Sequence, residues 1–304
     1  MLKVYPDYYG EFTCIADKCR HNCCIGWEID IDLNTYGFYR SQGGEFARRF
    51  AENIRHGDTP CFIPDENERC PFLNGKNLCD IITEFGEEHL CEICRQHPRF
   101  HNEFTDRTES GLGLACEECA RIIILRQEPM MLINSETSPC EEISLRDDII
   151  KLLQNRDLTV AERFSGALYT LNTEPAKVTL LSFARFLFSL ERLSTEWDRL
   201  LAFFISNCKE EENPEFARHM SSRMTEYENF AVYLIYRHFA CNKSSCRQVA
   251  KFAELMYRFL YCAAKLIFEK TGDFTRENQV ELMRLFSSEI EYSDENLRII
   301  LDSI

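Results

Sequence analysis

The sequence predicts a mainly α-helical protein in which a Cys-rich N-terminal region of loops and short helices packs on an α-helical bundle. Eleven of the sixteen cysteines precede residue 125, among stretches rich in Gly, Pro and Asn that favour turns over long regular elements. From about residue 144, apolar residues recur at helical spacing instead. We therefore expect a metal-binding domain at 1–126, a connection at 127–143 and an α-helical domain at 144–304.

Length and charge exclude several classes of protein. A chain of 304 residues with 45% hydrophobic and 28% charged residues is typical of one or two globular domains. The net charge of −15 would repel phosphate backbones, so nucleic acid is not an expected partner. No stretch reads as a secretory signal or as a membrane span. We expect a cytoplasmic protein.

Three short helices are expected in the N-terminal region, at about 33–55, 85–95 and 115–126. The helical half is clearer: "KVTLLSFARFLFSLERL" and "CRQVAKFAELMYRFLYCAAKLIFEK" carry apolar residues on one helical face. Predicted helix N-caps are Thr195, Ser245 and either Ser293 or Asp294, and Gly272 is predicted to end the longest helix. Cys208, Cys241, Cys246 and Cys262 fall on these helices, where free Cys commonly packs as a small apolar residue.

The densest group of thiols is "CIADKCRHNCCIGW", which holds Cys14, Cys19, Cys23 and Cys24 within eleven residues. Cytosolic thiols are held reduced, so this density favours metal binding or catalysis over disulfides. Zinc and iron-sulfur clusters usually take four thiolates at one centre. Side chains of adjacent residues diverge, so Cys23 and Cys24 are not expected to bind one small ion together.

A second group of thiols follows in "CPFLNGKNLCDIITEFGEEHLCEICRQHPRF" and "LACEECAR". It contains Cys70, Cys79, Cys91, Cys94, Cys116 and Cys119. The two CxxC pairs, 91/94 and 116/119, are separated by twenty-one residues, close to the spacing of a zinc ribbon. The pattern indicates a metal site without choosing between zinc and iron.

Two familiar motifs are absent from the sequence. The CxxxCxxC loop of radical S-adenosylmethionine enzymes would need a cysteine at position 26, which is Gly26. The stretch "GLGLAC" places Cys116 where a GxGxxG fingerprint needs its third glycine. A conventional Rossmann methyltransferase or dehydrogenase is therefore disfavoured.

The order and context of the cysteine motifs carry a family resemblance. "PDYYGEFTCIADKCRHNCCIGWEIDID", with Trp27 after the CC pair, is followed by "CPFLNGKNLCDI", "FGEEHLCEICRQHPR" and "GLACEECARIII". This arrangement resembles the flagellin lysine-N-methylase family, related to small proteins with a predicted zinc- or iron-chelating CxxCxxCC region. The resemblance covers roughly residues 6–125, whereas the helical half is similar only in kind.

The resemblance implies an enzyme that transfers a methyl group from S-adenosylmethionine to lysines of flagellin or a similar protein, with a [4Fe-4S] cluster. The family-matching thiols, which it implies as metal ligands, are Cys14, Cys19, Cys23, Cys24, Cys70, Cys79, Cys91, Cys94 and Cys116. Cys119 stands where the family has Ala, which weakens the zinc-ribbon pairing. No catalytic residue follows from the resemblance.

Other polar groups each have two interpretations. Arg95 and Arg99 could offset cluster charge or hold the carboxylate of the methyl donor, or form surface ion pairs. His97 could ligate metal or end a helix. Glu28, Asp30 and Asp32 share one face of a predicted strand, as a solvated surface, a landing surface for a substrate lysine or a base for its proton. Asp80, Glu87 and Glu88 are expected to be capping or surface acids.

Two alternative functions of the Cys-rich region stay open. A zinc-binding scaffold or interaction module without catalysis would use the same thiols in place of missing core. A redox or iron-handling protein would use an exposed thiol of low pKa. In the helical half, Tyr233, Tyr236 and His238 could line a pocket but are expected to pack in the core.

Overall fold

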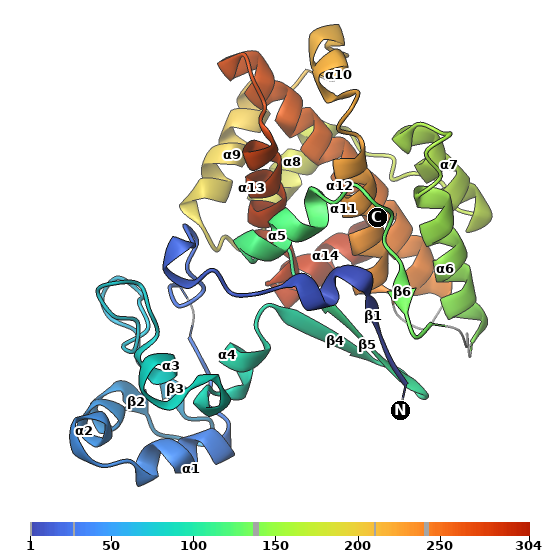
Figure 1. The fold of residues 1–304 in the computed structure, drawn as a ribbon. Coiled ribbons are helices and arrows are strands. Elements are labelled where there is room, and N and C mark those ends of the chain that lie inside the picture. Colours follow the sequence, from blue (N-terminus) through green and yellow to red (C-terminus); the bar gives the residue numbers. More distant parts are fainter. Residues whose placement is uncertain (1, 27, 136–139, 210, 240–242) are drawn as a thin grey trace. The chain divides into compact units, whose positions relative to one another are not determined.

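A computed structural model describes residues 2–26, 28–135, 140–209, 211–239 and 243–304 (Figure 1). The chain forms two units, which we describe separately. The Cys-rich unit comprises Thr13–Phe100, and the helical unit comprises Met1–Phe12 together with His101–Ile304. Among the described helices, none is long and apolar enough to cross a membrane. The prediction of a mainly helical protein is confirmed.

The helical unit begins with a small sheet of strand order β4-β5-β1-β6. Its strands are β1 (Leu2–Pro6), β4 (Arg99–Glu103), β5 (Arg107–Leu112) and β6 (Leu132–Ile133). Strand β1 runs parallel to β5, with Val4 opposite Glu109, and antiparallel to β6, with Tyr5 opposite Ile133. The sheet therefore joins segments from the chain's start to its middle.

This pairing explains why the predicted domain 1–126 coincides with neither unit. Residues 1–12 pair with β5, and α5 (Glu117–Ile124) contacts helices of the bundle. Both segments therefore belong to the helical unit. The predicted connection 127–143 contains β6, which pairs with β1. The predicted boundary follows the density of cysteines in the sequence. Pairing between distant strands leaves no local sequence signal, so the sequence could not show which unit these segments join.

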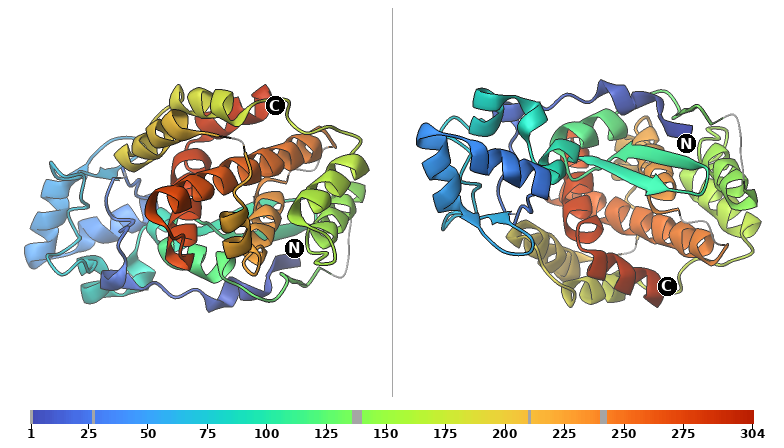
Figure 2. Two further views of the ribbon diagram at one scale, coloured as in Figure 1. Left: turned by 90° about the horizontal axis from the view of Figure 1, so that it is seen from above. Right: turned by 90° about the horizontal axis from the view of Figure 1, so that it is seen from below.

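The helical bundle surrounds the longest helix, α12 (Lys243–Thr271). The other helices are α6 (Glu141–Leu153), α7 (Val160–Thr170), α8 (Leu180–Phe188), α9 (Thr195–Asn207), α10 (Pro214–Met220), α11 (Thr225–His238), α13 (Arg276–Phe286) and α14 (Asp294–Ser303). Helix α12 contacts every one of these and runs through the unit in each view (Figures 1 and 2). Its apolar side chains, such as Phe252 and Phe259, are fully buried.

Local signals set several helix ends as predicted. Gly272 follows α12 with φ of 80°, a left-handed conformation that glycine adopts at little cost. The Ser293 hydroxyl accepts a hydrogen bond from the Asn296 backbone and caps α14. The predicted cap at Thr195 is wrong by one residue, because Ser194 accepts from the Trp197 backbone. The helix predicted to start at Ser245 already begins at Lys243.

The Cys-rich unit is built from short elements. They are α1 (Leu33–Ser41), α2 (Gly44–Asn53), β2 (Ile54–Arg55), β3 (Cys61–Phe62), α3 (Asp80–Phe85) and α4 (Glu92–Gln96), with 3-10 turns at Ala16–Lys18 and Glu87–His89. Its core is largely aromatic: Tyr39 and Phe50 stack at 4.3 Å between ring centroids, and Phe62 and Phe72 pack nearby. The helix predicted at 33–55 is divided into α1 and α2, and the helix predicted at 85–95 is wrong, because that stretch holds the end of α3, the 3-10 turn and the start of α4. The helix predicted at 115–126 is confirmed as α5, which belongs to the helical unit.

A buried ion pair ties the sheet of the helical unit to its first long helix. Glu109 of β5 and Arg146 of α6 have fully buried side chains, and Arg146 donates from two nitrogens to the two carboxylate oxygens, one bond measuring 3.1 Å. Arg107 lies 3.6 Å from the same carboxylate. Burial alone would lower the pKa of Arg146, but the hydrogen bond and charge of Glu109 raise it, so the guanidinium stays charged.

We predict that Glu109→Gln lowers the free energy of unfolding by about 3–5 kcal/mol, because it leaves a buried cation without its partner. Denaturant titration of the full chain measures this. The matched control is Glu174→Gln, which removes an exposed pair with Lys177 (side chains 72% and 82% exposed) and should leave the midpoint of the denaturant titration nearly unchanged. Equal stability of both variants would contradict the role of Glu109.

Candidate metal centre

Backbone hydrogen bonds bring three cysteine segments of the Cys-rich unit together. The Cys70 N–H donates to the Cys24 carbonyl at 2.8 Å, and Ile25 and Arg69 form an antiparallel bridge. Leu73 bridges to Cys79. Tight pairing of these short segments, rather than long elements, therefore sets the positions of Cys24, Cys70 and Cys79.

Two more thiols come from helix α4. Cys91 is the residue before its first turn, and Cys94 lies within it. Asp32 fixes the start of this helix by accepting a hydrogen bond from the Glu92 backbone at 2.9 Å. Cys91 is fully buried against the aromatic core, and Cys94 packs on the same core. The CxxC spacing places both thiols on neighbouring turns of one short helix.

Six thiols are close enough to influence one another's charge. They are Cys23, Cys24, Cys70, Cys79, Cys91 and Cys94, and we call them the thiol cluster. The pKa of Cys94 is raised by its hydrogen bond with Cys91, by burial and by the charges of Cys91, Cys24 and Cys70. The pKa of Cys24 is raised by its hydrogen bond with Cys23, by burial and by the charges of Cys23, Cys70 and Cys79.

Burial and mutual repulsion keep most of the cluster protonated in the absence of a cation. Burial raises the pKa of Cys70 to about 11 and also raises that of Cys79. The pKa values of Cys23 and Cys91 are lowered instead, because each accepts a hydrogen bond from its neighbouring thiol, Cys24 or Cys94. A multivalent cation is the natural way to hold several thiolates here, since it replaces repulsion by attraction.

His97 lies beside this cluster. Its backbone ends α4 by donating to the Ile93 carbonyl, as the helix-end interpretation predicts. Its side chain also contacts Cys23, where its hydrogen bond and charge help to lower the pKa of that thiol after the larger effect of Cys24. His97 is thus the imidazole that the Cys-rich unit brings to a cluster thiol, and metal ligation by it stays a prediction.

The remaining family-matching thiols have other surroundings. Cys14 accepts from the Ala16 N–H at 3.4 Å, and the Cys19 thiol donates to the His21 carbonyl at 3.3 Å. Both lie in the loop that precedes Cys23. Cys116 lies in the other unit, at the residue before α5. Ligation by Cys14, Cys19 and Cys116 stays a prediction.

The CxxC pairs of the proposed zinc ribbon belong to different units. Cys91 and Cys94 are in the Cys-rich unit, while Cys116 and Cys119 are in the helical unit, where Cys119 is fully buried. Near them lies Tyr292, whose pKa is raised to about 12 by burial and by the charges of Glu291, Cys116 and Cys119, although Arg237 opposes the shift. Sequence spacing alone could not reveal this division.

The arginines proposed to bind the methyl donor differ in their environment. Arg95 pairs with Glu92 at 3.2 Å, and both side chains are largely exposed (44% and 61%). This is the surface ion pair of the alternative interpretation. Arg99 begins β4 and is partly buried. Binding of a carboxylate by Arg95 and Arg99 stays a prediction.

The acidic stretch after the CC pair alternates in burial as predicted, but it forms only an isolated bridge between Asp30 and Cys61 and not the predicted strand. Ile29 and Ile31 are buried, whereas Glu28 and Asp30 are exposed. Asp32 is a capping residue, because it accepts from the Thr35 backbone at 3.0 Å in addition to Glu92, and these bonds lower its pKa despite partial burial. A functional role for the exposed face stays a prediction.

Two other acidic groups hold local structure in the Cys-rich unit. Asp80 accepts from the side chains of Arg49 and Asn74, each at 2.8 Å, so this first residue of α3 forms an ion pair and does not cap the helix as predicted. Glu28 pairs with Arg55 and accepts from the Cys61 thiol at 3.2 Å. Cys61, outside the family-matching set, is thereby a buried thiol of the same unit with a carboxylate partner.

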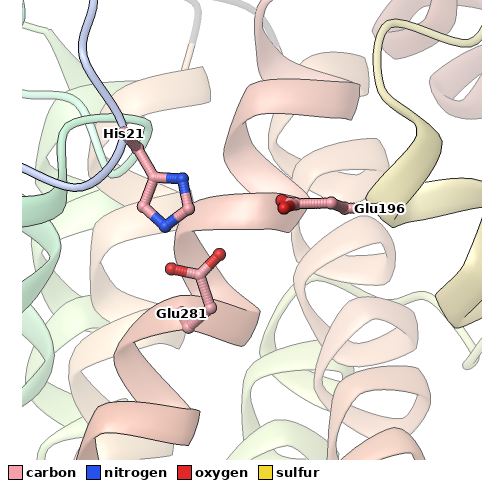
Figure 3. A group of neighbouring side chains, drawn as sticks. All are labelled: His21, Glu196 and Glu281. Atoms are coloured by element: carbon pink, nitrogen blue, oxygen red, sulfur yellow. The ribbon is translucent and has the colours of Figure 1, made fainter.

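The helical unit contains polar groups of its own. Figure 3 shows Glu196 of α9 and Glu281 of α13. Both carboxylates pair with Arg284, at 3.6 and 2.7 Å respectively. His21, also labelled in Figure 3, belongs to the Cys-rich unit. Such surface and partly buried ion pairs are common stabilising features of helix contacts.

Tyr233, Tyr236 and His238 of α11 pack in the bundle, as expected, but they also reach polar partners that sequence reasoning missed. Tyr233 donates to Glu291 at 2.8 Å and accepts from Arg237 at 2.6 Å. His238 contacts the other oxygen of Glu291 at 2.5 Å. Glu291 ends a π-helical turn, Ser287–Glu291, and nothing in its local sequence marks it as buried.

The late cysteines follow the packing prediction in part. Cys246 and Cys262 are buried, whereas Cys208 ends α9 and is partly exposed. Cys241 and the family-matching Trp27 lie outside the described residues.

Comparison with known proteins gives relatives but no structural match. The chain is 27% identical over 136 residues to lysine-N-methylases of Salmonella typhimurium and Salmonella choleraesuis, an alignment covering 42% of this chain and 33% of theirs. It is 26% identical over 136 residues to the flagellar biosynthetic protein FliU of Salmonella muenchen, covering 42% and 79% respectively. The chain thus covers about a third of the length of the lysine-N-methylases. No solved structure matches.

The family model locates the relationship in the helical unit. Residues 170–304 match the FliB lysine N-methylase C-terminal domain. The cysteine motifs place the resemblance at residues 6–125, and the sequence of the helical half shows only a general similarity. Helical packing leaves a weaker sequence pattern than spaced cysteines do. The match supports the resemblance, and residues 170–304 of this chain are similar to the C-terminal domain of the FliB lysine N-methylase family.

Proposed function

We propose that this chain is a protein lysine N-methyltransferase that moves a methyl group from S-adenosylmethionine to lysine side chains of flagellin or a similar protein. The proposal includes a [4Fe-4S] cluster held by thiols of the Cys-rich unit. The observation that carries it is the convergence of six family-matching thiols in that unit. The family match of residues 170–304 supports lysine as the group modified.

The donor set of the thiol cluster fits an iron-sulfur centre. Such a centre takes four cysteine thiolates, and the thiol cluster offers six, two of them on α4. Four of these six would hold a purely structural iron-sulfur cluster, and three would hold a cluster with one open iron, with the others or His97 beside it. When bound, the iron-sulfur cluster would supply positive charge to the thiolates. If one iron is left open, it would also supply a position for the methyl donor.

The chemistry requires positioning more than reactive side chains. Methyl transfer needs an unprotonated lysine amine in line with the sulfonium methyl group, so orientation and a proton acceptor are the minimum requirements. Arg95 and Arg99 remain the cations proposed for the carboxylate of S-adenosylmethionine. A guanidinium suits that task because its planar fork matches a carboxylate in two hydrogen bonds.

Flagellin as the substrate is supported by the name of a relative, a flagellar biosynthetic protein. We place the reaction in the cytoplasm, because a chain with this density of free thiols is best kept in a reducing compartment. The competing function, a zinc-binding interaction module, uses the same thiols and differs in the bound metal and in the absence of methyl transfer.

Protein purified without oxygen should contain iron and acid-labile sulfide in matching amounts and be brown. Cys94→Ser and Cys70→Ser should lose most of that iron, because each removes a thiol of the cluster. Cys61→Ser is the matched control, a buried thiol of the same unit bonded to Glu28, and should keep its iron. Elemental analysis measures all four proteins. Zinc without sulfide would favour the interaction module, and equal iron in every variant would contradict the ligand assignment.

The iron-loaded chain should transfer methyl groups from labelled S-adenosylmethionine to flagellin lysines, seen as 14 Da increments (about one methylene) by mass spectrometry. Cys94→Ser should lower this activity by about 100-fold or more if the centre orients the donor. Cys262→Ser, a buried thiol of the helical unit, should leave it unchanged. Metal-loaded protein that binds S-adenosylmethionine but methylates no lysine would overturn the proposed function.

A further inference from the structure

The pair His238 and Glu291 has the geometry of an oriented base. Glu291 is 5% exposed and ends the π-helical turn that follows α13. Its Oε1 lies 2.5 Å from Nε2 of His238, on α11. An ionised carboxylate can only accept, so Nε2 carries the proton and donates it. The imidazole is thereby held in one tautomer and one orientation.

Neighbouring cations and hydrogen bonds keep Glu291 ionised. Burial alone would raise the pKa of Glu291, but the charge of Arg237 and the hydrogen bond from His238 lower it to about 2. Arg237 lies 3.4 Å from Oε1, and Tyr233 donates to Oε2 at 2.8 Å. Three side chains, Arg237, Tyr233 and His238, therefore fix the position of the Glu291 carboxylate.

The second nitrogen of His238 is available. Nδ1 is bonded to none of the residues that the structure describes, and it is not among their buried polar atoms without a partner. The side chain is 9% exposed, and its ring packs edge-on against Phe252. Among the described residues, the lone pair of Nδ1 therefore has no partner, on a side chain that is only slightly exposed.

A histidine fixed by a carboxylate on one nitrogen and open on the other is a common arrangement for accepting protons. A histidine that only fills the core would have both nitrogens satisfied or excluded from solvent. Glu291 also lies on a π-helical turn, and such turns occur frequently at functional sites. These observations concern the helical unit alone, within the residues that match the lysine N-methylase domain.

We infer that His238 is the catalytic base that accepts the proton of the substrate lysine, with Glu291 as its positioning residue. This inference rests on the proposed function. Nδ1 takes one proton from the ε-ammonium, and the imidazolium is stabilised by Glu291. The freed amine then forms a bond to the methyl carbon while the sulfur–carbon bond breaks. The electron pair stays on sulfur, which leaves as a neutral thioether, and His238 releases its proton to water.

The test compares His238→Ala and His238→Gln with the wild type, using iron-loaded full-length protein, flagellin and S-adenosylmethionine. Both variants should lower kcat by about 100-fold or more near pH 7. The defect should shrink by about tenfold or more toward pH 10, because a lysine amine with an ordinary pKa of about 10.4 then loses its proton unaided. Added imidazole should restore His238→Ala but not His238→Gln, whose side chain fills the space.

The matched control is His219→Gln, in the same unit. Its Nε2 lies 2.8 Å from the Phe274 carbonyl, and its side chain is 28% exposed, so its loss should leave kcat unchanged. Circular dichroism and iron content verify folding, and His238→Gln retains a donor for Glu291 if His238→Ala unfolds.

Three outcomes are distinguishable. A defect that shrinks with rising pH and is rescued by imidazole supports the base. An unchanged kcat in the His238 variants, or a kcat defect that is equal at all pH values and is not rescued by imidazole, overturns the assignment of His238 as the base. In that case the activity of the wild type still supports the proposed function. A wild type that binds the methyl donor and methylates no lysine overturns both.

Discussion

Crowding of thiols is the constraint on which the Cys-rich unit depends. Six thiols lie within range of one another's charge, and several are buried against an aromatic core. In this environment each new thiolate makes the next more costly, so the unit is poorly suited to hold them all ionised by itself. A bound cation would compensate these charges, which is why the proposed function includes one.

The helical unit solves a different electrostatic problem. It buries several carboxylates and supplies each with arginines from another element. Glu109 meets Arg146, Glu228 meets Arg163 at 2.7 Å and Arg156 at 2.9 Å, and Glu291 meets Arg237. Removing one partner of such a pair is more damaging than replacing both. These pairs fix which segments meet, and Glu291 differs from the rest in having an imidazole as a further partner.

The sequence predicted what depends on local chemistry. Helical periodicity located the bundle, and the N-cap serine at 293 and the glycine at 272 marked two helix ends. Cysteine motifs located the Cys-rich unit, whose metal binding stays a prediction. The sequence could not predict the parallel pairing of β1 with β5, because residues about a hundred positions apart in the chain carry no local sign of contact. The contacts of Glu291 with His238, Tyr233 and Arg237 could not be predicted for the same reason, because tertiary packing determines which acidic residues are buried.

The pairing of β1 with β5 also determines the order in which the chain passes through the two units. The chain leaves the helical unit after Phe12 and returns to it at His101, so the Cys-rich unit is an insertion within another unit. Both ends of an insertion are anchored by its host, which limits the conformations open to it when it unfolds. Loss of metal could then melt the insertion locally while the host keeps its fold. Reloading would begin from a tethered, partly ordered chain and not from a wholly unfolded one.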